Sequence, residues 1–233
     1  RNSGDTLNYT EVASGGVQDS CEIYHTLRVP RGGEYTLVLA DGTTVYLNAE
    51  SELRFPKQFR GKNRKVYLTG EGYFDVQRNE KQPFIVEAQQ VEVRVLGTSF
   101  GVRAYTKEEN VLTTLIQGRV NVEADGQQVE LNPGQQADFN RGNDRLTVAE
   151  VDVEQYVGWK DGRLVFDNKP LEFILEELGR WYSFDVFYTN KELKEIPYSL
   201  NIKKHEDIAH VLKFIERTGK VKFEVNKNTI IVK

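Results

Sequence analysis

The feature that most constrains the fold of this chain is the stretch over residues 36–133, where short runs of strand-forming residues are repeatedly broken by glycine or Asp-Gly turns. Within residues 91–95 every second residue is valine, which is the period of a half-buried strand. Asp41-Gly42 and Asp125-Gly126 each separate two such runs. Both dipeptides predict type I′ hairpins, because both central residues of that turn must accept a positive φ. Short strands at this regular spacing indicate a sandwich, barrel or solenoid.

A different pattern begins after Gly158. Apolar residues recur at three- and four-residue spacing from Leu171 to Tyr182 and again from Ile208 to Ile215, so each segment is predicted to form an amphipathic helix. Strand-like runs flank both helices and give the order β-α-β, β-α-β-β. This order is typical of a small α+β domain.

We therefore predict a mainly β protein. Residues 1–26 are expected to form an N-terminal tail or a first strand. Residues 27–157 are expected to form an all-β domain of sandwich or solenoid type. Residues 158–233 are expected to form a small α+β domain with two helices on a short sheet. At 233 residues the chain is long enough for both domains to bury a core.

Composition excludes several classes of function. The net charge is −4, and a nucleic-acid-binding protein needs a basic face, so we expect no nucleic-acid partner. No stretch of about 18 apolar residues is present, so we expect no membrane segment in this chain. Methionine is absent, which leads us to expect a processed or truncated piece of a longer protein. The single cysteine, Cys21, can form no intrachain disulfide.

Several short motifs occur in a fixed order along the chain. They include Asp41-Gly42-Thr43, Gly70-Glu71-Gly72-Tyr73-Phe74, Gly97-Thr98, Pro133-Gly134-Gln135 and Trp181-Tyr182. Together they resemble the FecR-like anti-sigma factors of Bacteroidetes type. In that resemblance the β-rich part corresponds to the FecR domain. The C-terminal part is similar to the short domain found at the N-termini of secretins and TonB-dependent transducers.

The resemblance implies a regulator and no enzyme. It implies a periplasmic signal-receiving region that binds the N-terminal signalling domain of an outer-membrane TonB-dependent transducer and relays the signal to a cytoplasmic sigma factor. The full-length protein would then be a single-pass inner-membrane protein. Its contact with the sigma factor would be made by a cytoplasmic segment that this chain does not contain.

Glu71 and Asp75 are the carboxylates that most invite an enzymatic interpretation, as the paired acids of a glycosidase beside Asp41. On one strand, residues four apart lie about 13 Å from each other along the chain. A retaining glycosidase needs its two carboxyl groups about 5 Å apart. We therefore interpret Glu71 as a residue that caps or pairs within a turn, and we predict no catalytic residue.

The histidines, His25, His205 and His210, lack the three- or four-residue spacing of metal ligands on one helix face. We predict that they are exposed or locally hydrogen-bonded and that they hold no metal. Cys21 has His25 as its one neighbour able to activate a thiol. No phosphate-binding loop or nucleophile elbow is found, so no cofactor and no cofactor-binding residue are predicted.

An aromatic cluster supports an alternative function, that of a carbohydrate-binding or glycan-processing module. It consists of Trp181, Tyr182, Phe184, Phe187 and Tyr188. Aromatic faces can serve as platforms for sugars, but the first two residues lie on the apolar stripe of the predicted helix. We expect those two side chains in the core.

The candidate partner-binding residues form one predicted strand in the C-terminal part. They are Tyr198, Ser199, Leu200, Asn201, Ile202 and Lys203. If this strand lies at the edge of its sheet, it can accept a partner strand through backbone hydrogen bonds. The alternative is an ordinary internal strand with no partner outside the chain.

Overall fold

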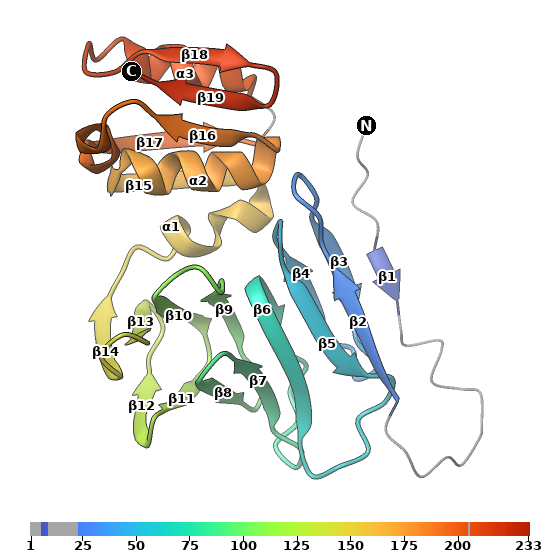
Figure 1. Ribbon diagram of the computed structural model, residues 1–233. Helices are drawn as coiled ribbons and strands as arrows, with labels where there is room; N and C mark the ends of the chain where they lie inside the picture. Colours follow the sequence, from blue (N-terminus) through green and yellow to red (C-terminus); the bar gives the residue numbers. More distant parts are fainter. Residues whose placement is uncertain (1–5, 9–22, 205) are drawn as a thin grey trace. The chain divides into compact units, whose positions relative to one another are not determined.

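The computed structural model describes residues 6–8, 23–204 and 206–233 (Figure 1). The chain divides into two compact units, Arg1–Val153 and Glu154–Lys233. The second unit thus begins ahead of the division expected at residue 158. No helix in the described part of the chain is long and apolar enough to cross a membrane.

The expected tail or first strand over residues 1–26 falls mostly on residues 1–5 and 9–22, which lie outside the described residues. In the described part of this segment, Thr6–Asn8 form a short strand that pairs in parallel with Tyr35–Val38, and residues 24–26 begin the strand Tyr24–Arg28.

The first unit is built from strands, and those in the described residues join into one 14-stranded hydrogen-bonded set. They are β1 (Thr6–Asn8), β2 (Tyr24–Arg28), β3 (Tyr35–Val38), β4 (Thr44–Leu47), β5 (Glu52–Pro56), β6 (Arg64–Asp75), β7 (Phe84–Ala88), β8 (Val91–Val95), β9 (Ser99–Ala104), β10 (Asn110–Gln117), β11 (Val120–Ala124), β12 (Gln127–Leu131), β13 (Gln135–Asn140) and β14 (Arg145–Glu150). The mainly β fold class is confirmed.

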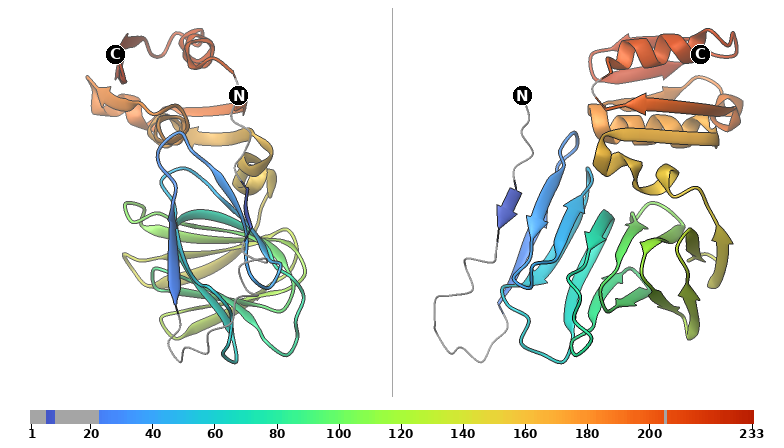
Figure 2. Two further views of the ribbon diagram at one scale, coloured as in Figure 1. Left: turned by 90° about the vertical axis from the view of Figure 1, so that its right-hand side faces the viewer. Right: turned by 180° about the vertical axis from the view of Figure 1, so that it is seen from behind.

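The long strand β6 belongs to two layers of this strand set. Residues 64–68 pair in parallel with β7, in the layer that also holds β2, β5, β8, β11 and β12. Residues 70–75 pair antiparallel with β9, in the layer that holds β3, β4, β10, β13 and β14. Figure 2 shows the strands of this unit from two further directions. Strands that pass from one layer to the other form the corners of such packed sheets.

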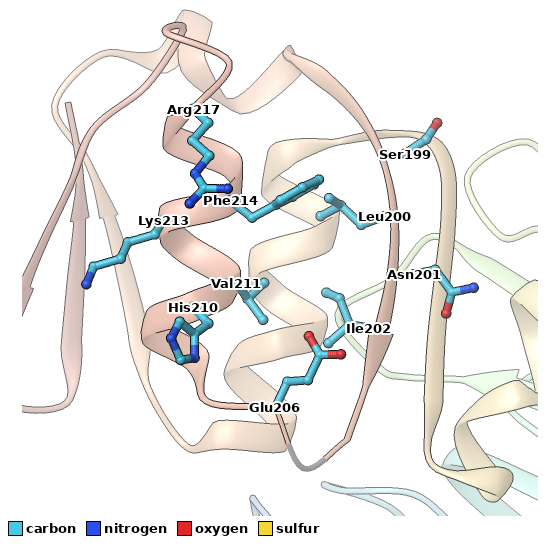
Figure 3. A pocket seen from close by; sticks show the side chains of 10 residues that line it. All are labelled: Ser199, Leu200, Asn201, Ile202, Glu206, His210, Val211, Lys213, Phe214 and Arg217. Atoms are coloured by element: carbon cyan, nitrogen blue, oxygen red, sulfur yellow. The ribbon is translucent and has the colours of Figure 1, made fainter.

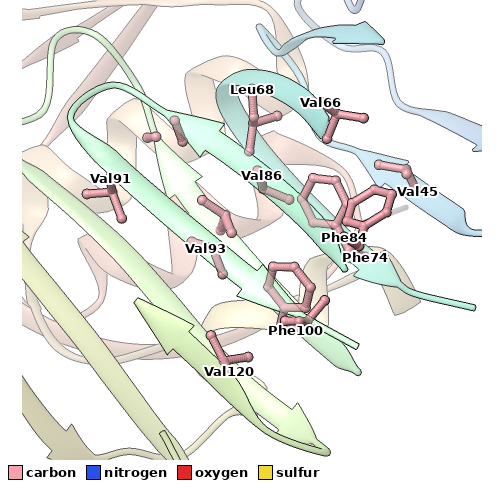
Figure 4. Packing of buried hydrophobic residues seen from close by; sticks show 14 of the residues in the cluster. Val45, Val66, Leu68, Phe74, Phe84, Val86, Val91, Val93, Phe100 and Val120 are labelled. Atoms are coloured by element: carbon pink, nitrogen blue, oxygen red, sulfur yellow. The ribbon is translucent and has the colours of Figure 1, made fainter. Parts of the chain in front are cut away.

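The core of the first unit lies between these layers (Figure 4). Phe74 on β6 stacks on Phe100 of β9 with ring centroids 5.3 Å apart, and it also meets Phe84 of β7 at 6.2 Å. All three rings are fully buried. Burying one such side chain stabilises a fold by about 1.5–3 kcal/mol, so this cluster is a main source of the unit's stability.

One of the two predicted hairpin turns is confirmed. Asp125 and Gly126 have φ values of 45° and 71°, and β11 and β12 pair directly across them, as in a type I′ turn. The same prediction for Asp41-Gly42 is wrong, because only Gly42 of this pair has a positive φ, at 86°. The loop there is longer and is closed by a bond from the Leu39 N–H to the Thr43 carbonyl.

The reason lies in the side chain of Asp41. Its carboxylate accepts hydrogen bonds from the Thr43 N–H at 3.1 Å and the Thr43 hydroxyl at 2.7 Å. It also pairs at 2.7 Å with the guanidinium of Arg64, which is buried on β6. An aspartate that bonds to the backbone two residues on favours this kind of turn, and the ion pair fixes it to the sheet.

The second unit contains the helices and two further sheets. Its elements are α1 (Glu154–Val157), the 3₁₀-helix η2 (Gly158–Asp161), β15 (Arg163–Pro170), α2 (Leu171–Tyr182), β16 (Asp185–Tyr188), the 3₁₀-helix η3 (Lys191–Glu195), β17 (Pro197–Lys203), α3 (Ile208–Glu216), β18 (Phe223–Asn226) and β19 (Thr229–Val232). One sheet pairs β15 with β17, and the other has the order β16-β19-β18. Where the sequence suggested one short sheet, there are two, because β16 pairs in parallel with β19 and not with β17.

Candidate functional site

The candidate partner-binding residues all lie on β17. Tyr198, Leu200 and Ile202 are buried, while Ser199, Asn201 and Lys203 are exposed, as the alternation in the sequence predicts for a half-buried strand. β17 pairs antiparallel with β15, from Arg163 opposite Lys203 to Pro170 opposite Pro197. The strand therefore has one face against the interior of the unit and one face in solvent.

Within the described residues, β15 is the one strand that pairs with β17. The backbone N–H and C=O groups along the second edge of β17 consequently have no strand partner there. Such an edge is a template for pairing with another chain, because an added strand satisfies a whole row of donors and acceptors at once. The alternative of an ordinary internal strand therefore does not describe β17 within this unit.

Side chains at one end of β17 hold the strand in place. The Ser199 hydroxyl donates to Asp167 at 3.0 Å and accepts from the Asn168 N–H at 2.9 Å. Asn168 has a φ of 48° and lies where the pairing with β15 shifts register between Phe166 and Lys169. Ser199 on β17 thus bonds to both residues at the register shift of β15. These hydrogen bonds fix this end of β17 to β15.

A groove of about 450 Å³ runs along β17 and is bounded on its other side by α3 (Figure 3). Leu200 and Ile202 point from β17 toward the helix, whereas Ser199 and Asn201 point to the opposite side. The residues that line the groove are Ser199, Leu200, Asn201, Ile202, Glu206, His210, Val211, Lys213, Phe214 and Arg217. Because residues from both faces of β17 line it, the groove follows the edge of the strand.

The helix α3 is positioned by its cap and its apolar stripe. The Asp207 carboxylate accepts from the Ala209 N–H at 3.0 Å and so caps the helix N-terminus. Val211, Leu212 and Ile215 are buried and fix the helix against the unit. Phe214 lies off this stripe, is 59% exposed and points toward Leu200 across the groove.

The link between β17 and α3 is anchored to α2. The Tyr182 hydroxyl donates to the Glu206 carbonyl at 2.8 Å and lies 3.3 Å from the Lys204 carbonyl. Burial raises the pKa of Tyr182, and the nearby Glu206 and Asp207 carboxylates raise it further. The hydroxyl therefore remains a neutral donor at physiological pH, and one end of the groove keeps its shape.

The carboxylates that invited an enzymatic interpretation have separate structural partners. Glu71 is buried on β6, where it accepts from the Asn48 amide at 2.7 Å and pairs with Arg103 at 3.4 Å. Asp75 accepts from the Ser99 hydroxyl at 2.8 Å. Glu71 therefore does not pair within its own turn as expected, because its partners are Arg103 on β9 and Asn48, the residue after β4.

The aromatic cluster behind the carbohydrate alternative is divided between core and surface. Trp181 and Phe184 are buried, and Tyr182 and Tyr188 are partly buried. Phe187 is 60% exposed. One exposed ring on β16 does not form a platform with the other four.

The two histidines that the structure describes lie in different units. His25 stacks on Phe55 with ring centroids 6.1 Å apart, and His210 is exposed on α3. His205 and Cys21 lie outside the described residues. Among the residues that the structure describes, no group of three or more histidine, cysteine, aspartate or glutamate side chains could hold a metal ion.

Sequence reasoning missed the contribution of α3 to the candidate site. The apolar periodicity of the helix predicts its buried stripe, and Phe214 falls outside that stripe. An aromatic side chain on the polar face of a helix is the signal that points to this surface. The cationic residue Arg217 gives no such signal, because exposed cations are common on helix surfaces.

Comparisons with known proteins agree with this architecture. A family model described as "FecR protein" matches residues 25–121, and one described as "FecR, C-terminal" matches residues 163–232. The chain belongs to the FecR family. The second match contains both β17 and α3, so the groove lies within the FecR C-terminal part.

Two crystal structures, at 1.65 Å and 2.50 Å resolution, are described as a "putative anti-sigma factor" from Parabacteroides distasonis ATCC 8503. Each matches this chain with a TM-score of 0.83 and 27% identity, over 90% of this chain and 98% of the other. The comparison with curated proteins found no match. Together the family and the structures identify a FecR-like anti-sigma factor, which is a regulatory class of protein.

Proposed function

We propose that this FecR-family chain is the periplasmic, signal-receiving region of a transmembrane anti-sigma regulator. It binds the N-terminal signalling domain of an outer-membrane TonB-dependent transducer. The signal then passes to a sigma factor held by a cytoplasmic segment outside this chain, through a single inner-membrane helix that is also outside it. The protein performs no catalysis in this role and needs no cofactor.

The observation that carries the proposal is the second edge of β17, which has no strand partner in the part of the chain that the structure describes. Tyr198–Lys203, the residues expected to contact a partner, lie on this strand, and Ser199–Ile202 among them line the groove. Backbone groups that point outward along an edge strand give affinity to any strand laid beside them. The first unit then serves as a scaffold, because its buried side chains are engaged in its own core and ion pairs.

The three carboxylates that suggested a glycosidase do not favour an enzymatic function. Asp41, Glu71 and Asp75 each pair with a different group, and two of these pairs are with buried arginines. A glycosidase needs one carboxyl group free to give a proton and a second to act as nucleophile or base. The aromatic cluster likewise gives no support to a glycan-binding function, because Trp181 and Phe184 are buried while Phe187 is exposed.

The proposal is tested by isothermal titration calorimetry of the full chain with the purified N-terminal signalling domain of the TonB-dependent transducer encoded beside its gene. We expect saturable one-to-one binding. The matched control is the signalling domain of an unrelated transducer, for which we expect weaker binding or none. If the full chain binds neither domain, the proposed function is rejected.

A further inference from the structure

The groove between β17 and α3 has opposite charges at its two ends. Arg217, on the last turn beyond α3, lies at the end beside Ser199 and Leu200, while Glu206 lies at the end beside Ile202 (Figure 3). The Glu206 N–H also donates to the Lys203 carbonyl at 2.9 Å, which fixes this end of the groove to the end of β17. The charges therefore give the groove a polarity along its length. A bound segment must carry the complementary charges in the matching order.

Within the described residues, the charged side chains that line the groove make no ion pair. Among the described residues, no ion pair joins Arg217 or Lys213 to a carboxylate, and none joins Glu206 to a cation. Exposed charges of this kind contribute little to the stability of a fold. They can instead select a partner, because charge complementarity suppresses wrong partners and fixes the register of the right one.

Between Arg217 and Glu206 the lining includes four apolar side chains, beside the polar Asn201 and His210 and the cation Lys213. Phe214 and Val211 contribute from α3, and Leu200 and Ile202 contribute from β17. Phe214 is more than half exposed, and exposed aromatic side chains within a recessed surface are the typical anchors of protein interfaces. An aliphatic side chain from a bound strand would cover this ring and remove it from water.

From these features we propose that the groove binds one extended segment of the transducer's signalling domain as a third strand beside β17. The segment carries an acidic side chain toward Arg217, an aliphatic side chain against Phe214 and a basic side chain toward Glu206. This inference rests on the proposed function and adds the chemistry by which the partner is recognised. The part of β17 in the groove, Ser199–Ile202, is about 10 Å long at the rise of a strand, so about four residues of the segment lie within it.

The test is the same titration with variants of the full chain. A double variant, Arg217→Glu with Glu206→Lys, reverses the direction of the charges and keeps the net charge. We expect it to bind the signalling domain at least about tenfold more weakly, because like charges then face each other at both ends. Phe214→Ala is expected to weaken binding by about tenfold or more through loss of the anchor.

The chain offers matched controls outside the groove. Phe187→Ala removes a ring that is exposed to the same extent as Phe214, and Lys191→Glu changes an exposed charge on η3. Neither residue lines the groove, so both variants are expected to bind like the wild type. All of these side chains are exposed, and a thermal unfolding curve for each variant checks that the fold is retained.

The outcomes separate the two proposals. If the wild type binds the signalling domain and the groove variants bind equally well, the strand-recognition inference is overturned while the proposed function stands. If the wild type does not bind, both are overturned. A full chain that elutes as a dimer, and as a monomer after Phe214→Ala, would also overturn the inference, because the occupant would then be a second copy.

Discussion

Gly70 is the residue that allows β6 to serve both layers of the first unit. It has a φ of 93°, and it follows the last residue paired with β5 and begins the pairing with β9. A Cβ at this position would lie 2.5 Å from the Oγ and 2.7 Å from the Cα of Ser51. The glycine is therefore required both by the backbone conformation and by the close approach of the neighbouring loop.

The substitution Gly70→Ala is accordingly expected to destabilise the first unit. A positive φ in a residue with a Cβ costs about 1–3 kcal/mol, and the contact with Ser51 adds to this cost because backbone must move. Chemical denaturation measures the change in the free energy of unfolding. The control is Gly126→Ala, at an open turn where no atom is within 4 Å of the new Cβ. This variant should therefore lose less stability than Gly70→Ala. Equal losses in the two variants would refute the role of close packing at Gly70.

Asp138 on β13 makes the stability of the first unit depend on pH. Burial raises the pKa of its carboxyl group, and the hydrogen bond from the Asn110 amide at 3.0 Å opposes this shift only in part. Its Oδ1 atom is buried with no hydrogen-bond partner among the described residues. Because the folded-state pKa is above the unfolded value, the folded state binds more protons. Stability is then lost as pH rises from the unfolded pKa through the folded one.

Asp138→Asn is expected to raise the thermal unfolding temperature at pH 7, because a neutral amide costs less to bury than a carboxylate and still accepts from Asn110. The advantage over the wild type should shrink as the pH is lowered and the carboxyl group of Asp138 becomes protonated. Thermal unfolding followed by circular dichroism at a series of pH values measures this. A difference that stays constant with pH would contradict the assignment to Asp138.

Among the elements, α3 has a buried face that packs against the unit and an opposite face that we propose binds the partner. Ile215 is completely buried on the stripe that packs against the unit, whereas Phe214, next to it in the sequence, is mostly exposed. The two neighbouring residues therefore have different expected roles, and substitutions can distinguish them.

Ile215→Ala is expected to cost about 2–5 kcal/mol of stability, because it leaves a cavity in the core. Phe214→Ala is expected to change stability by no more than about 0.5 kcal/mol, as for most surface substitutions. Denaturant titration of both variants gives the two free energies of unfolding. A loss for Phe214→Ala as large as that for Ile215→Ala would show that the ring is part of the core.

Periodicity explains how much of the elements the sequence could predict. The segment from Leu171 to Tyr182 forms α2, and the apolar spacing from Ile208 to Ile215 falls within α3, because one buried stripe repeats every 3.6 residues. β17 has the expected alternation for the same reason, with a period of two. The turn at Asp41-Gly42 was not predictable in this way, because Arg64, 23 residues later in the chain, binds the Asp41 carboxylate.

The candidate site was predictable in part. Tyr198–Lys203 were found from their alternation, but whether the strand lies at an edge depends on how β15, β16 and β19 pair. The groove depends on α3 lying beside that edge. Such a juxtaposition arises from tertiary packing, and no local pattern in the sequence encodes it.

At the scale of the whole molecule, the chain joins two units of different character. The first buries a cluster of phenylalanine rings and the arginines of two ion pairs within a layered β structure, which suits a scaffold. The second, which matches the FecR C-terminal family model, leaves a strand edge and a groove exposed. We therefore propose that the partner contact lies in the second unit and that the first unit supports it.

Amide hydrogen exchange of the full chain, with and without the transducer's signalling domain, shows where on the chain the partner binds. We expect slower exchange on binding along Ser199–Ile202 and on the exposed face of α3, because an added strand pairs with the outward backbone groups of β17. We expect no new protection at the exposed turn between β13 and β14. Binding that instead protects amides of the first unit and leaves β17 unchanged would show that the partner contact lies in the first unit.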